Sequence, residues 1–255
     1  MTVPQVSARE QFGRVAEAYV HSRGHAEGED LERIVALAAA TPEDHVLDIA
    51  TGGGHTALAL ARVAGHVTAS DLTPEMLDAA EAHLRGAGVA NVDFAPADAQ
   101  ALPFPDDSYD IVTCRIAPHH FAEPAAFVGE VRRVLRPGGR FLLEDTVVPA
   151  GETATYINRI ERLRDPSHAR SLSVDEWWGL LLEAGFSVLH IETFRKRHDL
   201  AEWMERMQTP PDRQAEVRAG FAAAPPAVRR AFEVELDDAG RRVAFWDLKG
   251  LFLAV

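Results

Sequence analysis

Apolar residues along this chain fall into two alternating patterns, short continuous runs and longer stretches with helical spacing. A short apolar run predicts a strand buried on both faces, and apolar residues three or four positions apart predict a helix with one buried side. The short runs are Val46–Ala50, His66–Ser70, Asn91–Ala95, Tyr109–Cys114 and Arg140–Asp145. Helical stretches precede the first run and separate most of the others. This alternation predicts a doubly wound, Rossmann-like α/β fold with a mostly parallel sheet.

The pattern changes after the fifth run. Thr153–Arg164 has helical spacing, and Ser173 with Glu176 forms a capping-box pattern at the start of another helix. Phe186–Ile191 and Val243–Val255 contain further strand patterns, with a polar helical segment between them. We expect the final strand to be antiparallel to its neighbour, and the helical segments to be insertions that cover the ligand side of the sheet.

Composition narrows the classes of function. The net charge of −13 and the pI of about 5.3 oppose binding to nucleic acid or to an anionic membrane, both of which need clustered Lys and Arg. A single cysteine, Cys114, excludes an internal disulfide and a cysteine-based zinc site. No His, Cys, Asp and Glu cluster has metal-ligand spacing, so we expect no metal. Without an apolar run of ~20 residues or a signal-peptide pattern, we expect a soluble cytoplasmic protein with no integral membrane segment.

The first apolar run leads directly into a glycine cluster and then into an Ala/Leu-rich helical pattern. A strand, a tight turn and a helix in this order bring backbone N–H groups close to a nucleotide-like ligand. Glycine permits positive φ and has no Cβ atom to block close approach. The spacing Gly52-x-Gly54-x-x-Ala57 also satisfies the dinucleotide fingerprint, so the turn alone does not decide which ligand binds.

Acidic residues stand at the carboxyl ends of three predicted strands: Asp48, Asp71 and Asp98. In an open α/β sheet the ligand binds beyond these ends. Asp71 is placed to accept hydrogen bonds from both hydroxyls of a ribose, and Asp98 from an adenine amino group. Each has a structural alternative, a carboxylate at a helix N-terminus for Asp71 and a turn-stabilising aspartate for Asp98.

Five segments together resemble the class I S-adenosylmethionine-dependent methyltransferases, in that family's order and spacing. They are Val46–Ala57, Ala69–Leu72, Ala97–Phe104, Asp110–Cys114 and Leu135–Gly139. The likeness is to the ubiquinone/menaquinone-biosynthesis methyltransferase-like group. It implies S-adenosylmethionine as the cofactor, and one methyltransferase domain over residues 1–255. We expect an N-terminal helical cap over 1–40, a cofactor-binding core over 41–150, and helical insertions with the last strands over 151–255.

The resemblance also implies how the cofactor is held. Asp48 matches the acid near its methionine end, and Arg115 with Ile116 borders it. Ala50 stands where many members have glycine, and we expect its methyl group to add little bulk. The full set of expected cofactor contacts is Asp48, Ala50, Thr51, Gly52, Gly54, Asp71, Leu72, Met76, Asp98, Ala99, Arg115 and Ile116.

Candidate groups for the chemistry lie after the fourth strand. A carbon or weakly acidic oxygen acceptor needs a general base, and His119 or His120 is the candidate, because imidazole titrates near ~6.5. A histidine pair in such a place also serves for hydrogen bonding or shape alone. The sequence does not identify a carboxylate partner for either ring.

Candidate substrate contacts are Phe12, Tyr19, His25 and His168. Phe12 and Tyr19 form either a lid over the cofactor or part of a helix packed on the sheet. For His25 and His168 the competing interpretation is a surface histidine.

Three functions stay open at this stage. The favoured one is C- or O-methylation of a small, apolar or aromatic acceptor. The alternatives are an NAD-dependent oxidoreductase, which the dinucleotide fingerprint allows, and a non-catalytic module that binds S-adenosylmethionine or S-adenosylhomocysteine. The acceptor and the oligomeric state do not follow from the sequence, and a homodimer is compatible with it.

Overall fold

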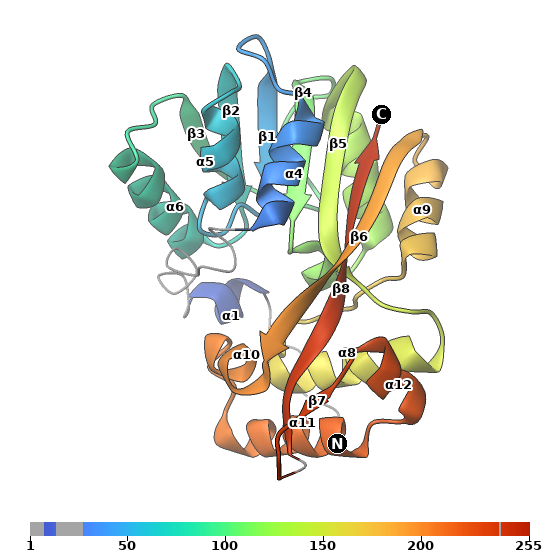
Figure 1. The fold of residues 1–255 in the computed structure, drawn as a ribbon. Helices are drawn as coiled ribbons and strands as arrows, with labels where there is room; N and C mark the ends of the chain where they lie inside the picture. Colours follow the sequence, from blue (N-terminus) through green and yellow to red (C-terminus); the bar gives the residue numbers. More distant parts are fainter. Residues whose placement is uncertain (1–7, 14–27, 240) are drawn as a thin grey trace.

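The computed structural model describes residues 8–13, 28–239 and 241–255, so Tyr19 and His25 lie outside the described residues. The strands of the described part form one sheet in the order β3-β2-β1-β4-β5-β8-β6 (Figure 1), and β7 pairs with β8. Neighbours are parallel from β3 to β5. β8 is antiparallel to β5, which confirms the expected antiparallel final strand. The strands are β1 His45–Ile49, β2 His66–Asp71, β3 Val92–Pro96, β4 Tyr109–Arg115, β5 Leu135–Val147, β6 Val188–Asp199, β7 Glu235–Leu236 and β8 Arg242–Ala254.

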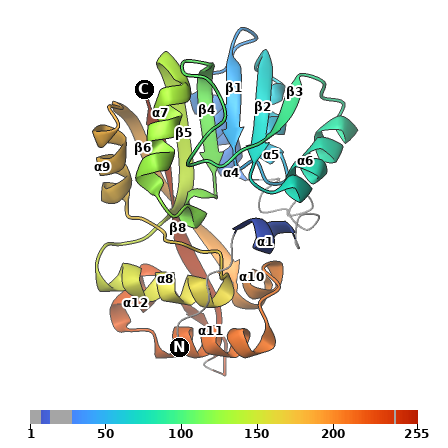
Figure 2. The same ribbon diagram turned by 180° about the vertical axis from the view of Figure 1, so that it is seen from behind.

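Helices pack on both faces of the sheet (Figures 1 and 2). One hydrophobic core joins Val46 of β1 to α4 (Glu29–Ala38), α5 (His55–Ala61) and α6 (Pro74–Gly86). The other joins the next residue, Leu47, to α7 (Pro124–Val134) and α9 (Val174–Glu183). Successive side chains of a strand point to opposite faces, so a continuous apolar run supplies both cores at once.

A third core holds the helical insertions together at the carboxyl end of the sheet. Here β6 and β8 extend beyond the parallel strands, and four helices surround their ends (Figure 1). Trp203, Phe221 and Phe245 pack against one another at this place, with ring centroids 4.9 to 6.1 Å apart. The helices are α8 Glu152–Arg164, α10 Leu200–Arg206, α11 Pro211–Ala223 and α12 Pro226–Ala231.

Two strands differ in length from the sequence prediction. β6 continues to Asp199 because it pairs with β8 throughout, and its exposed outer positions gave that stretch a polar pattern. β5 begins at Leu135, which pairs with Tyr109 before an irregularity in the register. The Pro-Gly-Gly sequence, Pro137 to Gly139, therefore lies within the first part of β5, where Gly138 has a φ of 78°.

The short helix α1 (Ala8–Gly13) lies between α6 and α10 (Figure 1). The side-chain amide of Gln11 donates to the carbonyl of Met207 at 3.2 Å, which ties α1 to the residue after α10. Opposite α1, the chain leaves β4 through a single turn of 3₁₀ helix, η1 (Pro118–His120). Both segments bring side chains to the carboxyl ends of the parallel strands.

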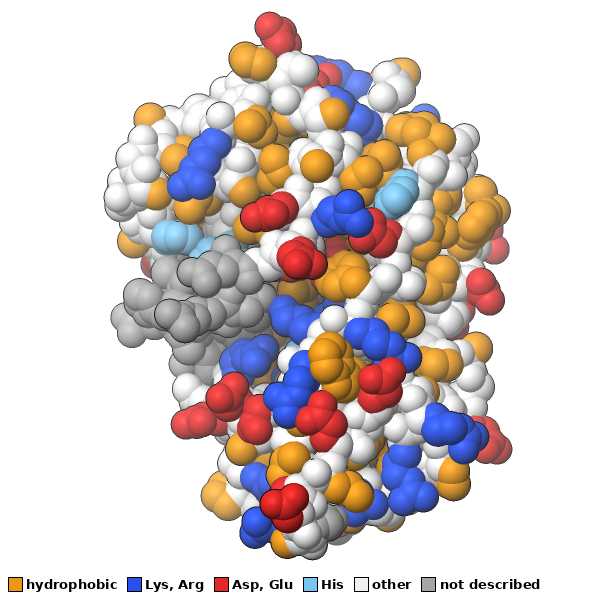
Figure 3. Space-filling model, viewed as in Figure 1, with side chains coloured by type: hydrophobic (Ala, Val, Ile, Leu, Met, Phe, Trp, Pro, Cys, Tyr) orange, Lys and Arg blue, Asp and Glu red, His pale blue; other side chains and the backbone are white. Residues whose placement is uncertain are grey.

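Charges of both signs are interspersed on the face of the molecule shown in Figure 3. Ion pairs join Arg33 to Glu192 at 2.7 Å and Arg197 to Glu235 at 2.6 Å. Within the described residues, no helix is both long and apolar enough to cross a membrane.

We predict that Gly65→Ala destabilises the fold by about 1–3 kcal/mol, because a Cβ atom there would lie 2.1 Å from the backbone oxygen of Pro42. Gly86→Ala is the matched control: nothing lies within 4 Å of its Cβ position, at the end of α6. The control should be neutral or more stable by about 0.5–1 kcal/mol. Urea unfolding of both variants measures the difference, and equal free energies of unfolding for the two would contradict the prediction.

Candidate active site

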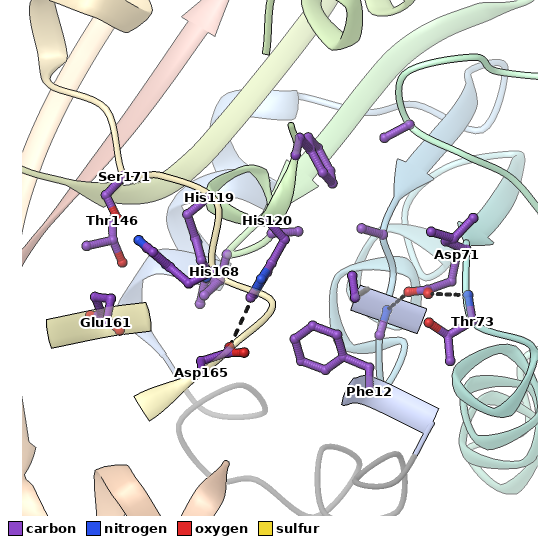
Figure 4. Close-up of a pocket in the computed structure, with 18 of the residues that line it drawn as sticks. Phe12, Asp71, Thr73, His119, His120, Thr146, Glu161, Asp165, His168 and Ser171 are labelled. Atoms are coloured by element: carbon purple, nitrogen blue, oxygen red, sulfur yellow. Dashed lines mark hydrogen bonds and ion pairs between the residues drawn. The ribbon is translucent and has the colours of Figure 1, made fainter. Parts of the chain in front are cut away.

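A cavity of about 1230 Å³, its open mouth included, lies beyond the carboxyl ends of the parallel strands. Figure 4 shows its two ends, with Asp71 and Thr73 on one side and Glu161 on the other. We call the first the glycine end, lined by Ala50, Gly52, Asp71, Leu72, Met76, Asp98 and Ala99. The second is the charged end, lined by Glu161, Arg164, Asp165, His198, Arg206, Asp247 and Lys249.

The glycine turn after β1 forms the floor of the glycine end. Gly52 has a φ of 53°, and nothing lies within 4 Å of its Cβ position, so the backbone is open on that side. Gly54 has a different role. A Cβ atom there would lie 2.6 Å from Leu84 and 3.1 Å from Ala80, so this glycine allows α6 to pack closely. Gly54, although expected among the cofactor contacts, lines neither of the two cavities described here.

Asp48 lies beneath the turn and is 1% exposed. Its two carboxylate oxygens accept hydrogen bonds from the hydroxyls of Thr51 and Thr113, both at 2.7 Å. Burial raises the pKa of Asp48 to about 6, despite these hydrogen bonds. Asp48 and Thr51 border a second, smaller cavity that also reaches Arg115.

Asp71 and Asp98 both line the main cavity, and both also support a turn. Asp71 accepts from the backbone N–H of Gly52 at 3.0 Å and of Thr73 at 2.9 Å, and burial raises its pKa. Asp98 accepts from the backbone N–H of Gln100 at 2.9 Å. The structural and the ligand-binding interpretations are therefore compatible, since each carboxylate oxygen has two lone pairs.

Ala50 and Ile116 line both cavities and both have positive φ, 53° and 54°. The cost of alanine in place of glycine at position 50 is therefore the strain of its positive φ, and not the bulk of its methyl group. A β-branched residue with positive φ is strained, and such strain occurs mostly at functional sites. The N–H of Ile116 donates to the carbonyl of Glu144 at 2.8 Å, which holds this conformation.

Of the two cavities, Arg115 borders only the smaller one, and its side chain is 5% exposed. Its Nε lies 2.8 Å from Asp30 of α4 and 3.1 Å from Glu144 of β5. Burial raises the pKa of Glu144 to about 8, although Arg115 opposes this. The side chain therefore joins the N-terminal helix to the sheet as well as bordering the site.

His119 and His120 stand between the two ends of the main cavity, with ring centroids 4.2 Å apart (Figure 4). His119 Nδ1 lies 2.6 Å from Asp145, which is fully buried. His120 Nδ1 lies 3.1 Å from the hydroxyl of Ser167, and its Nε2 lies 3.9 Å from Asp165. Burial and the neighbouring His119 lower the pKa of His120 to about 4. Each histidine therefore has a carboxylate neighbour that the sequence did not identify.

Two of the candidate substrate contacts, Phe12 and His168, lie within the described residues. Phe12 lines the main cavity, and its ring meets the edge of His120 at 4.9 Å between centroids. His168 also lines it but is 1% exposed, so the competing interpretation of a surface histidine is wrong. Its Nε2 lies 2.7 Å from the side-chain oxygen of Asn158, and burial lowers its pKa.

Most residues of the charged end were not predicted from the sequence. Lys249 and Asp247 come from the antiparallel strand β8, and their side chains lie 2.9 Å apart. Arg164 of α8 lies over the ring of Trp203 at 4.3 Å. These segments are far apart in the sequence, and no local motif marks them. Asp145 was detectable, because it stands at the carboxyl end of β5 as Asp71 does for β2. Among the described residues, no group of three or more His, Cys, Asp or Glu side chains is arranged to hold a metal ion.

Comparisons with known proteins agree with this geometry. Residues 47–143 match the family model described as a methyltransferase domain. An uncharacterised methyltransferase of Bacillus subtilis, YcgJ, is 37% identical over 235 residues, which cover 92% of this chain and 93% of that protein. A demethylmenaquinone methyltransferase of Clavibacter sepedonicus is 36% identical over 149 residues, 57% of this chain and 59% of that protein.

A solved structure has a similar fold over most of the chain. A crystal structure of a protein from Bacillus halodurans, described as a putative methyltransferase, superposes with a TM-score of 0.85 at 37% identity and covers 89% of this chain and 98% of that chain. A superposition over 89% of this chain includes more than the parallel core. The chain belongs to the class I S-adenosylmethionine-dependent methyltransferases.

Proposed function

We propose that this protein transfers the methyl group of S-adenosylmethionine to a carbon or oxygen atom of a small acceptor. The observation that carries the proposal is one cavity with two different ends and a buried histidine–aspartate pair between them. The glycine end suits a nucleoside. The other end leaves room for an acceptor on the far side of His119 and His120.

The residues of the glycine end fit the cofactor in shape and in hydrogen-bonding capacity. Gly52 offers backbone without a Cβ atom, and the lone pairs of Asp71 that remain free suit two ribose hydroxyls. Asp98 would accept from the adenine amino group, with Leu72, Met76, Ala99 and Ile116 as apolar surfaces around the base and ribose. Asp48, Thr51 and Arg115 would hold the methionine end through the smaller cavity. The cofactor supplies an electrophilic methyl group bound to a sulfonium.

His119 is the proposed general base. An ionised carboxylate only accepts hydrogen bonds, so the contact with Asp145 places the imidazole proton on Nδ1 and leaves Nε2 free to take a proton from the acceptor. Asp145 then stabilises the imidazolium that forms. Enclosure by α1 and the insertion helices excludes water, which favours alignment of the acceptor with the methyl group.

The acceptor was expected to be apolar or aromatic, and this stays a prediction. Phe12, Phe121 and Trp203 line the cavity and offer flat apolar surfaces to an aromatic ring. The two alternative functions make different predictions. An NAD-dependent oxidoreductase would bind NADH, and a non-catalytic module would bind S-adenosylmethionine without transferring its methyl group.

Asp71→Ala should weaken S-adenosylmethionine binding by about tenfold or more, because the hydrogen bonds that the ribose hydroxyls donate to the charged carboxylate are lost. Isothermal titration with S-adenosylmethionine measures the affinity. Asp78→Ala is the matched control, since Asp78 is an exposed residue on α6 outside the cavity. Wild-type affinity in the folded Asp71 variant would contradict the ribose role, and binding of NADH alone by the wild type would favour the oxidoreductase.

His119→Gln should lower the rate of methyl transfer by roughly a hundredfold to ten-thousandfold, the usual effect of losing a general base. S-adenosylmethionine affinity should not change. Asp145→Asn should also slow the reaction, because an amide in place of the carboxylate no longer holds the imidazole proton on Nδ1. Formation of S-adenosylhomocysteine with any acceptor that the wild type methylates is the assay. His190→Gln, a change at a half-buried position of β6 outside the cavity, is the control. Full activity of His119→Gln would remove the base from the proposal.

The lowered pKa of His120 predicts a dependence of stability on pH. Between pH 6.5 and about 4 the unfolded chain binds a proton at His120 more readily than the folded chain does. The free energy of unfolding should therefore fall as the pH falls through this window, by up to about 1.4 kcal/mol per pH unit from this group. His120→Gln should show a flatter dependence in urea unfolding measured at several pH values. Parallel curves for the two proteins would show that His120 does not titrate in this way.

A further inference from the structure

The segment between β3 and β4, residues 97–108, contains no helix and only one isolated β-bridge. It nevertheless carries Asp98 and Ala99, which line the glycine end of the cavity. The start of the segment is fixed by β2, because the N–H of Ala97 donates to the backbone carbonyl of Asp71 at 3.0 Å. The rest of the segment needs partners from other parts of the protein, since irregular backbone satisfies few of its own hydrogen-bonding groups.

Helix α7 supplies these partners through an arginine and a glutamate. It packs on the face of the sheet that is toward the viewer in Figure 2. Arg133 donates to the backbone carbonyls of Leu102 at 3.0 Å and Phe104 at 2.7 Å. Its guanidinium also donates to Asp106 at 2.9 Å and to the two carboxylate oxygens of Glu130 at 2.8 and 2.6 Å. These five hydrogen bonds use all five N–H groups of the guanidinium.

Glu130 binds the same segment as an acceptor. Its Oε2 accepts from the N–H of Leu102 at 2.7 Å, so the ion pair binds both backbone polar groups of that residue. The side chain of Leu102 is 5% exposed and belongs to the core that also contains Val131 of α7. Two parallel hydrogen bonds between a guanidinium and a carboxylate fix the relative orientation of both side chains. Leu102 is therefore held by a rigid pair of charges as well as by apolar packing.

A tight turn connects Leu102 to Asp98. The N–H of Ala101 donates to the backbone carbonyl of Asp98 at 3.0 Å. Gln100, inside the turn, is linked to the first part of α7, because its side-chain oxygen accepts from the N–H of Glu123 at 2.6 Å. The turn is thus short and is bound to the same helix on both sides. The place of Asp98 at the cavity depends on where α7 holds the segment.

The carboxylate of Asp98 is oriented as well as placed. Its Oδ1 accepts from the backbone N–H of Gln100 at 2.9 Å and from the side-chain amide of the same residue at 3.3 Å. Both hydrogen bonds that the described residues donate to this carboxylate fall on Oδ1, which leaves Oδ2 to accept from a ligand. Hydrogen bonds weaken steeply when distance or angle departs from the optimum, so a small shift of the turn would cost such a contact.

We propose that Arg133 and Glu130 are positioning residues for recognition of the adenine base, although neither lines one of the two cavities described above. They fix Leu102, and through the turn they place Asp98 within hydrogen-bond distance of the adenine amino group. The inference rests on the proposed binding of S-adenosylmethionine at the glycine end. It means that this pair on α7 determines how well the site distinguishes adenine from a base without the amino group.

The test is isothermal titration with S-adenosylhomocysteine and with S-inosylhomocysteine, in which a carbonyl oxygen replaces the amino group of the base. The wild type should bind the adenine compound about tenfold or more tightly, because only its amino group can donate to Asp98. Arg133→Lys keeps the positive charge but cannot bind two carbonyls and a carboxylate in one plane. This variant should bind S-adenosylhomocysteine about tenfold more weakly and S-inosylhomocysteine almost unchanged. An equal loss for both compounds, or no loss, would overturn the inference, since a merely structural role does not distinguish the bases.

Arg132→Lys is the matched control, because Arg132 is the neighbouring residue of α7 and lies over the ring of Phe186, at 5.8 Å from its centroid. Both affinities should equal those of the wild type. If urea unfolding shows that Arg133→Lys is not folded, Glu130→Gln replaces it with the same expected result.

A double variant tests whether Arg133 acts through Asp98. Asp98→Ala removes the contact with the base, so adding Arg133→Lys to it should cause no further loss of S-adenosylhomocysteine affinity. A further tenfold loss would show that Arg133 acts on another part of the site and would overturn the inference. Equal binding of the two compounds by the wild type would also overturn it. Failure of the wild type to bind S-adenosylhomocysteine would instead contradict the proposed function.

Discussion

A buried carboxylate at the end of β1 holds together the part of the sheet on which the site is built. The carboxylate of Asp48 accepts hydrogen bonds from hydroxyl groups of the glycine turn and of β4. Its backbone carbonyl accepts a hydrogen bond from the hydroxyl of Ser70 in β2 at 3.2 Å. A buried carboxylate must be compensated by hydrogen bonds, so the positions of these three segments are not independent. The glycine turn, where we propose that the cofactor binds, is therefore held in place by the protein's own hydrogen bonds, although burial raises the pKa of Asp48 to about 6.

Two residues with a strained backbone conformation lie at the same edge of the sheet as Asp48. Ala50 and Ile116 have positive φ at the carboxyl ends of neighbouring strands, and both border the two cavities. The hydrogen bond from Ile116 to Glu144 and the ion pair between Arg115 and Glu144 tie this strained segment to β5. Strain of this kind persists only where the surroundings determine the backbone. The rigid sheet thus stabilises a backbone shape that suits a ligand and would be unfavourable in an isolated loop.

The sequence was sufficient for the parallel core and for the glycine end, because each signal there is local. A strand, its turn and the acid beside it are adjacent in the chain, as Asp48 and Gly52 are. The pairing of His119 with Asp145 depends on the neighbouring positions of β4 and β5, which only the folded sheet fixes. The burial of His168 depends on Asn158 across a loop, and the exposed face of β6 gave a polar pattern that concealed its length. Long-range contacts therefore account for most of what the sequence did not show.

The two ends of the cavity are built in different ways, and this difference bears on specificity. The glycine end is formed by backbone and strand termini, so a change there disturbs the sheet itself. The charged end is formed by side chains from α8, α10 and β8, which have a hydrophobic core of their own. Side chains at that end can therefore differ without disturbing the glycine turn. The matched family model covers residues 47–143 and ends before Asp145, Glu161 and Lys249, so it does not describe the charged end. Likeness over residues 47–143 is then evidence for methyl transfer, whereas the acceptor must be inferred from the residues beyond them.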